Sequence, residues 1–368
     1  MKVNFNRAAL AEALSLVTVV VPSRTPKPIL QCLRVSAQEK DVHIFATNLE
    51  VGINYVVSEV QIEEPGEVVI PADRLAAIVR EGVDEVLTIK AEEGVCEVIG
   101  ADSHFTIYGQ QASQYPAMPG LDGTADIEVR LDNLQLGIEQ CLFATAKEST
   151  RYAINGILWA IKGKKLFLVA TDGRRLAQSR VNLTNTPEKE ISEAKIIIPA
   201  KTMELIDKIP GSEKDSVVVK LVDNQVLISC ANVVISSNLV EGNFPKYEDI
   251  IPTDYEKKIT LSTEAALSAV RRAALLTSDE SRGIKIAIDK NSLVFSSRAP
   301  ETGDAQITMV VDYKGEAIDI GFSPQFLIDV LRVIRTPDFD LEIGQSDRPG
   351  LIKSGANFLY VIMPINLG

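Results

Sequence analysis

The chain repeats one pattern three times, and this repetition constrains its fold more than any other feature of the sequence. Each copy contains a short apolar strand, a helix that starts near a proline, a turn and a second strand. The copies are separated by about a third of the chain. The repeated segments are residues 68–90, 196–221 and 318–343, with their prolines at Pro71, Pro199 and Pro324.

Further segments repeat around this core and complete the unit. Period-two alternation predicts strands with one buried face, and each helix carries one apolar face. Each unit is therefore expected to be α+β, with its helices on one face of antiparallel sheets. The opening strand–helix segments are 3–17, 129–145 and 259–275; the alternating segments are 41–50, 165–174 and 291–300; the closing segments are 105–116, 234–245 and 357–364.

Two linker-like stretches divide the chain into three such domains. Residues 120–127 and 250–256 are rich in Gly, Pro and Asp, which favour turns and loops. We therefore expect domains at 1–122, 123–252 and 253–368. Side-chain oxygens that can accept from free backbone N–H groups are expected to cap the first helix of each domain. The expected caps are Asn6, Asp132, and either Ser262 or Thr263.

Cysteine and histidine are too sparse to indicate a metal site. The four cysteines are scattered without a CxxC pair, so we expect buried free thiols in a reducing cytoplasm. The two histidines, His43 and His104, lie in alternating segments and are expected on strands. No signal peptide or apolar run near the ~20 residues that span a membrane is present. We expect a cytoplasmic protein with no metal, no cofactor and no membrane partner.

The stretch LVATDGRRLAQ, residues 168–178, suggests a functional site. Turn chemistry explains Asp172-Gly173. It leaves four interpretations of Arg174 and Arg175: a phosphate site, partners of a catalytic Asp172, a DNA contact, or solvated charge. The chain has no GxxxxGK[ST], HExxH, GxSxG or GxGxxG motif, so we do not expect an enzyme.

Net charge of −12 argues against a nucleic-acid partner if the charge is spread evenly. Lysines and arginines nevertheless recur on or beside the repeated helices, although acidic residues lie among them. A ring of repeated domains with basic helices inside and acidic sheets outside would reconcile this charge with DNA binding. The alternative is an ordinary solvated surface on each helix. The basic residues that we place inside such a ring are Arg74, Arg80, Lys201, Arg271 and Arg272.

Several motifs, taken together, resemble the bacterial DNA polymerase III beta subunit family, the DNA sliding clamps, along the full length of the chain. They are TPKPIL (25–30), RYAINGILW (151–159), VATDGRRLA (169–177), LVEGNFPKYEDIIP (239–252) and YVIMPINL (360–367). The resemblance implies three clamp domains per chain, closing head-to-tail as a homodimer into a six-domain ring around duplex DNA. It implies a processivity factor without chemistry of its own. The alternative is a protein-binding repeat scaffold that does not encircle DNA.

The resemblance also implies partners and sites. The partners would be the replicative polymerase, the clamp loader, translesion and repair polymerases, mismatch-repair proteins and ligase, all bound through short peptide motifs. DNA contacts would fall on Arg24, Glu148 and Tyr152. The family often has an amide near 148 and an aromatic residue at 153, so Glu148 and Ala153 depart from its pattern and would weaken loop contacts to DNA.

A peptide pocket between the second and third domains is the third implied site. It would combine an apolar floor with a few polar groups that fix the peptide. Arg174 stands where the family has His, and Asp249 replaces a basic residue, so preference at the rim departs from the family. The matching positions are Arg151, Ile154, Thr171, Gly173, Arg174, Arg175, Leu176, Pro245, Tyr247, Val361, Met363, Pro364 and Ile365, with Arg151 and Tyr247 near the rim.

The dimer interface would join the first domain of one chain to the third domain of another. Phe105 and Ile107, on an edge strand, would meet Leu275 and Leu276 at a helix end. Apolar anchors inside a polar rim are typical of stable interfaces. The alternative is that these four side chains belong to the cores of their own domains.

Overall fold

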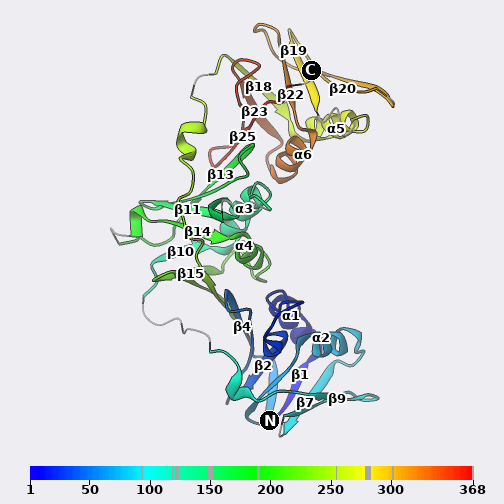
Figure 1. The fold of residues 1–368 in the computed structure, drawn as a ribbon, viewed down its shortest axis with the longest axis vertical. Helices are drawn as coiled ribbons and strands as arrows, with labels where there is room; N and C mark the ends of the chain where they lie inside the picture. Colours follow the sequence, from blue (N-terminus) through cyan, green and yellow to red (C-terminus); the bar gives the residue numbers. More distant parts are fainter. Residues whose placement is uncertain are drawn as a thin grey trace. The chain divides into compact units, whose positions relative to one another are not determined.

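The fold is described by a computed structural model (Figure 1). It describes residues 1–92, 94–117, 120, 124–147, 152–188, 191–253, 255–277, 283–300 and 302–366, without the side chains of Tyr152 and Ser192. The expectations for Glu148 and Arg151, and for the side chain of Tyr152, therefore lie outside the described residues.

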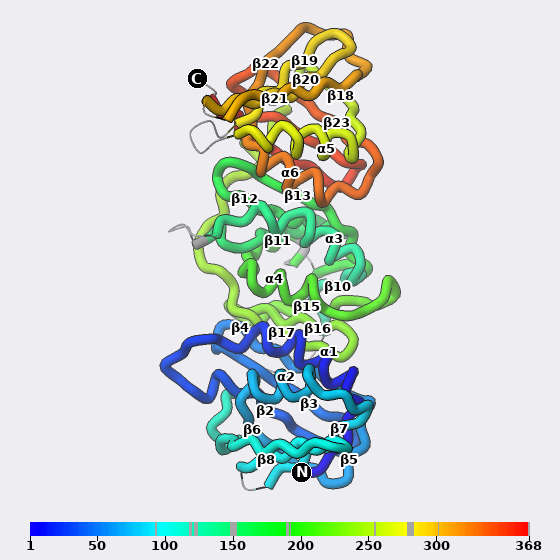
Figure 2. Tube along the Cα trace, turned by 90° about the vertical axis from the view of Figure 1, so that its right-hand side faces the viewer, coloured from blue at the N-terminus to red at the C-terminus, as the bar shows by residue number. Residues whose placement is uncertain are grey.

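Two α-helices occur in each third of the chain, as the repeat predicts. Within the described part of the chain, α1 and α2 lie side by side, and so do α5 and α6 (Figures 1 and 2). Helix α1 packs on β3 and β4, and α5 packs on β20 and β21, so each pair covers a sheet face. The helices are α1 (Arg7–Val17), α2 (Ala72–Glu81), α3 (Leu131–Leu142), α4 (Ala200–Asp207), α5 (Thr263–Ala274) and α6 (Pro324–Val333).

The described strands form four antiparallel sheets. The first two have the orders β5-β1-β7-β8-β9 and β10-β15-β16-β17-β4-β3-β2-β6. Their strands are β1 (Lys2–Asn6), β2 (Cys32–Ala37), β3 (Val42–Thr47), β4 (Val51–Val57), β5 (Val60–Glu64), β6 (Gly66–Pro71), β7 (Val86–Glu92), β8 (Val95–Ile99), β9 (His104–Tyr108), β10 (Ile127–Arg130), β15 (Ser216–Val222), β16 (Gln225–Cys230) and β17 (Val233–Asn238).

The other two sheets have the orders β14-β11-β12-β13-β25-β24-β23-β18 and β21-β20-β19-β22. Their strands are β11 (Gly156–Lys162), β12 (Lys165–Thr171), β13 (Arg175–Asn182), β14 (Lys195–Pro199), β18 (Lys257–Ser262), β19 (Ile284–Asp289), β20 (Ser292–Ala299), β21 (Gly303–Val310), β22 (Ile318–Phe322), β23 (Asp338–Ile343), β24 (Gly350–Ser354) and β25 (Phe358–Ile362).

The two eight-stranded sheets each join strands from different thirds of the chain. Strand β17 pairs with β4, and β25 pairs with β13, both antiparallel. We call these pairs the first and second seams. Each seam lies inside one of two compact units: Met1–Asp132 with Leu183–Glu188 and Glu204–Leu239, and Asn133–Asn182 with Lys189–Met203 and Val240–Gly368. The boundary between the two units therefore runs through the middle repeat rather than between repeats.

The N-caps expected from the sequence are present, with one exception. The Asn6 side chain accepts from the backbone N–H of Ala8 and Ala9, at 2.9 and 3.2 Å. Ser262, rather than Thr263, caps α5. The expectation for Asp132 is wrong, because α3 already begins at Leu131 and Asp132 lies within its first turn.

Cysteines and histidines occupy structural positions. All four cysteines are buried free thiols, and burial raises the pKa of Cys96 to about 12. His43 lies on β3 and His104 on β9, as expected. Among the described residues, no group of three or more His, Cys, Asp or Glu is placed to hold a metal ion. No helix in the described ranges is long and apolar enough to cross a membrane.

We predict that Gly156→Ala destabilises the fold. Gly156 faces Pro199 across β11 and β14, and an added Cβ would press on the backbone carbonyl oxygen of Ile198. Backbone cannot move aside cheaply, so we expect a loss of about 1–3 kcal/mol, measured as a lower urea midpoint.

Gly137→Ala in α3 is the matched control. The atoms nearest its Cβ would belong to the side chains of Leu168, Val181 and Ser179 rather than to backbone, and alanine gains about 1 kcal/mol of helix propensity over glycine. If both variants unfold at the wild-type midpoint, the close backbone approach at Gly156 does not constrain the sheet.

Candidate functional site

The 171–175 turn is built by its own side chains. Thr171 Oγ1 accepts from Gly173 N–H at 3.1 Å and donates to the carbonyl of Arg175 at 2.7 Å. Asp172 Oδ1 accepts from the backbone N–H of Arg174 and Arg175 at 2.9 and 3.1 Å. Gly173 has φ +86°, in the left-handed region that glycine adopts without strain. Asp172 is therefore a turn residue, and these contacts account for it without a role as a general base.

The first repeat contains the same turn without the arginines. Asn48 Oδ1 accepts from the N–H of Glu50 and Val51 at 2.9 and 2.7 Å. Leu49 N–H donates to Thr47 Oγ1 at 3.0 Å. Leu49 also has φ +76°, which is strained for a bulky side chain. The turn therefore belongs to the repeated architecture, and the two arginines are an addition to it.

The two arginines have different environments. Arg174 is exposed, and its carbonyl accepts from Met363 N–H at 3.0 Å. The Arg175 side chain is only 9% exposed and pairs with Asp172 and Asp329 at 2.9 and 2.7 Å. Burial lowers the pKa of Arg175, but its hydrogen bond to Asp329 and its interactions with Tyr360 and Asp172 together outweigh burial, and the pKa is raised. Arg175 is therefore committed to internal partners.

Several residues expected in the pocket share one apolar cluster. Leu176, Tyr247 and Val361 pack together with Ala153 and Val169. Leu176 and Val361 are 1% exposed, and Tyr247 is 2% exposed. Burial raises the pKa of Tyr247 to about 12, and it lies in this floor rather than at a rim. Ile154 and Thr171 are also buried, whereas Pro245, Pro364 and Ile365 are half-buried.

Met363 is the accessible apolar group beside this floor, with 38% of its surface exposed. Its N–H is fixed by the Arg174 carbonyl. Two residues later, Ile365 N–H donates to the Gly321 carbonyl of β22 at 2.9 Å. We call Met363–Asn366 the tail. These two backbone hydrogen bonds hold it at Met363 and at Ile365.

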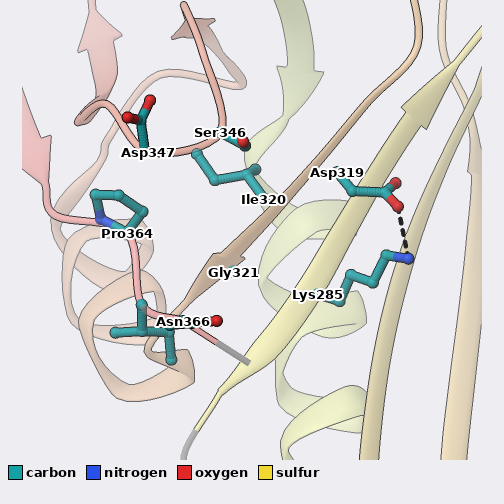
Figure 3. A pocket seen from close by; sticks show the side chains of 9 residues that line it. Lys285, Asp319, Ile320, Gly321, Ser346, Asp347, Pro364 and Asn366 are labelled. Atoms are coloured by element: carbon teal, nitrogen blue, oxygen red, sulfur yellow. Dashed lines mark ion pairs between the residues drawn. The ribbon is translucent and has the colours of Figure 1, made fainter. Parts of the chain in front are cut away.

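A cavity of about 510 Å³ lies beside the tail (Figure 3). Pro364 and Asn366 form one side, Ser346 and Asp347 stand opposite, and Lys285 pairs with Asp319 at 2.6 Å along another wall.

The third repeat lacks a backbone hydrogen bond that the first two repeats share. At the corresponding position of the first repeat, Gly109 N–H donates to Gly94, and in the second repeat Leu239 N–H donates to Asn224. Pro364 has no N–H to close the same contact.

The residues expected to face DNA that the structure describes with their side chains are exposed. Arg24 lies in the loop before η1 (Pro28–Gln31), and Gln31 Nε2 donates to the Ser23 carbonyl of that loop at 2.9 Å. Ser23 and Arg80 line one cavity of about 520 Å³, so the loop and α2 are adjacent. The other basic residues expected to face DNA are also exposed: Arg74 on α2, Lys201 on α4, and Arg271 and Arg272 in the last turn of α5.

The four residues expected at the dimer interface differ in burial. Phe105 is 43% exposed and Leu275 is 79% exposed. Leu276 is half-buried, whereas Ile107 is 6% exposed and packs within its own domain. Phe105 and Ile107 lie on β9, an edge strand of the five-stranded sheet.

Sequence reasoning missed the partners that occupy Arg175. Asp329 on α6 and the carbonyl of Phe143 both bond it. Neither residue stands in a motif, and each is far from Arg175 in sequence.

Comparisons with known proteins cover the whole chain. Family models of the DNA polymerase III beta subunit match residues 1–119 (N-terminal domain), 128–246 (central domain) and 248–366 (C-terminal domain). The beta sliding clamp of Caulobacter vibrioides is 30% identical, with all of both chains covered. That of Chlamydia pneumoniae is 27% identical, covering all of this chain and 99% of the relative.

Solved structures agree. The DNA polymerase sliding clamp of Bacillus subtilis aligns with a TM-score of 0.93 at 27% identity, covering all of this chain and 99% of that one. A sliding clamp of Pseudomonas aeruginosa bound to griselimycin aligns with a TM-score of 0.93 at 28% identity over all of both chains.

Proposed function

The chain belongs to the DNA polymerase III beta subunit family, the non-enzymatic sliding clamps that serve as DNA polymerase processivity factors, and we propose that two copies close into a ring around duplex DNA. The ring would form head to tail from six repeated domains, with boundaries near 122 and 252. It would act in the cytoplasm and hold the polymerase to its template by topology.

The observation that carries this proposal is that two strands, β9 and β21, correspond to the strands of the two seams but lack a partner of that kind in the part of the chain that the structure describes. The order β1-β7-β8-β9 corresponds to β10-β15-β16-β17 and to β18-β23-β24-β25. Likewise β4-β3-β2-β6 corresponds to β13-β12-β11-β14 and to β21-β20-β19-β22. Strands β17 and β25 pair with β4 and β13, whereas β9 and β21 lie at sheet edges among the described strands. A third seam, β9 with β21 of a second copy, would satisfy both edges.

The existing seams predict the register of the third. Ile235 faces Ile53 in the first seam, and Tyr360 faces Ala177 in the second. By strand equivalence, Phe105 would face Ala305 of the second copy, and His104 would face Gln306. Phe105 stands where the buried Ile235 and Tyr360 stand, so the third seam would cover its exposed ring. Head-to-tail closure of two copies makes this seam twice.

DNA would be held loosely so that the ring can slide. Diffuse contacts to phosphate are independent of sequence and weaken with salt. The exposed Arg24, Arg74, Arg80 and Lys201, with the α5 arginines, support such contacts. The net charge of −12 then belongs to surfaces away from the DNA.

The Met363 side of the second seam would receive partner peptides. A buried apolar floor, an exposed methionine and half-buried prolines suit short peptides with apolar anchors. The occupants would come from the replicative polymerase, the clamp loader, translesion and repair polymerases, mismatch-repair proteins and ligase. The griselimycin-bound relative supports ligand binding to clamps of this fold. Exposed Arg174 and Asp249 would shape the preference for peptide sequences at the rim of the pocket.

We predict that the double variant His104→Cys, Gln306→Cys forms a covalent dimer under mild oxidation. Directly opposed antiparallel residues have Cα atoms about 4.5–5.5 Å apart, within the range of a disulfide. The native thiols are buried and do not compete. Non-reducing electrophoresis measures the product.

A register-shifted pair, His104→Cys with Thr308→Cys, is the matched control. Thr308 lies two residues further along β21, on the same face, so its cross-link should be much slower. A 40 kDa monomer in sedimentation at micromolar concentration, or equal cross-linking of both pairs, would contradict the ring.

We predict that Met363→Ala weakens binding of a fluorescein-labelled peptide with leucine and phenylalanine anchors. Loss of an apolar anchor at the cleft should cost about 1–3 kcal/mol, read as fluorescence anisotropy, with the dimer intact. Val222→Ala is the control, since Val222 has the same 38% exposure on β15. Equal affinity of the two variants would place the peptide elsewhere.

A further inference from the structure

We propose that Arg175 is a positioning residue, which sets the geometry of the tail without touching the partner peptide. This inference rests on the proposed peptide cleft beside Met363. It extends that proposal by naming what holds the cleft open in its binding shape.

Arg175 joins three separate elements through its guanidinium. Nε donates to Asp172 Oδ2 in the turn at 2.9 Å, and Nη1 donates to Asp329 Oδ2 on α6 at 2.7 Å. Nη2 donates to the carbonyl of Phe143, just beyond the end of α3, at 2.8 Å. The planar fork of arginine can serve three directions at once, which a lysine ammonium on its flexible stem cannot reproduce.

Aromatic rings enclose the same guanidinium. Its carbon lies 4.3 Å from the centre of the Phe326 ring on α6 and 5.4 Å from that of Phe143. Tyr360 on β25 donates its hydroxyl to the Phe326 carbonyl at 3.1 Å. Cation–π contact in a desolvated site adds to the ion pairs, so Arg175 binds α6 to the turn by both charge and packing.

The first repeat shows that the turn does not need this arginine. Met363 N–H bonds Arg174, and in the first seam Asn238 N–H bonds Glu50 in the same way. The residue equivalent to Arg175 is therefore Val51, and its turn is complete without a guanidinium. What Arg175 adds at the second seam is the connection to α6.

That connection reaches both supports of the tail. The first support is the Arg174 carbonyl, in the turn that Arg175 holds through Asp172. The second is the Gly321 carbonyl on β22, which accepts from Ile365. Strand β22 ends at Phe322 and α6 begins at Pro324, so fixing α6 fixes β22. Arg175 thereby sets the spacing of the two supports between which Met363 and Pro364 lie.

The test compares Arg175→Met, Arg175→Lys and Asp329→Asn in the full chain. Arg180→Met is the matched control, because Arg180 lies on the same strand, bonds the side chain of Asn357, and stands at the other end of the seam. Peptide affinity is read with the same fluorescein-labelled peptide. Hydrogen exchange of the Met363 and Ile365 amides is read without peptide.

We expect Arg175→Met to raise the peptide Kd about tenfold and to speed exchange of both tail amides by a similar factor, since removing one partner leaves two carboxylates unpaired. Arg175→Lys and Asp329→Asn should shift both readouts in the same direction by less. Arg180→Met should match the wild type.

Two results would overturn the inference. Tail exchange and peptide affinity both unchanged in the Arg175 variants would show that Arg175 does not set the tail. Weaker peptide binding with unchanged tail exchange would show direct contact with the peptide. If the wild type binds no peptide, the proposed cleft fails, while the exchange readout still decides the role of Arg175. If Arg175→Met does not fold, Arg175→Lys and Asp329→Asn decide it.

Discussion

Unpaired backbone at the edge of a β-sheet is the constraint on which the rest of this structure depends. A strand edge presents N–H and C=O groups that pair with another strand when one is available. The chain meets this need twice, by pairing β17 with β4 and β25 with β13. Three repeats contain three such pairs of edges, so β9 and β21 remain for a second copy. The proposed ring thus follows from counting edges in a repeat.

One scaffold carries different chemistry at its two internal seams. In the first seam, Phe45 and Ser236 crowd the space beside Gly52, and Phe45 packs edge-on against the buried Tyr115 at 5.6 Å between ring centres. In the second seam, Leu176 faces Val361, and Met363 stands exposed beside them. An aromatic pair fills the first seam with the chain's own side chains. The second seam keeps an apolar surface that a partner can cover.

The sequence predicted what depends on local pattern. The threefold repeat, the cap at Asn6 and the strand positions of the histidines all follow from spacing and side-chain type. The cap at Asp132 failed because α3 starts at Leu131, two residues before the start that a cap at Asp132 predicts, and such boundaries depend on packing that a pattern does not contain. The partners of Arg175 were equally hidden, because Asp329 and Phe143 approach it only after folding. Arg174 and Arg175 look equivalent in sequence, yet one is exposed and the other is enclosed.

The central claim is that DNA is held by topology, and retention on closed and open DNA tests it most directly. The protein is loaded onto nicked circular duplex DNA with its cognate clamp loader, freed of loader, and followed before and after the circle is cut once. The account predicts stable retention on the circle and rapid loss from the linear product, because a ring slides off a free end. Equal retention on both forms would contradict encirclement and assign binding to direct contacts with DNA.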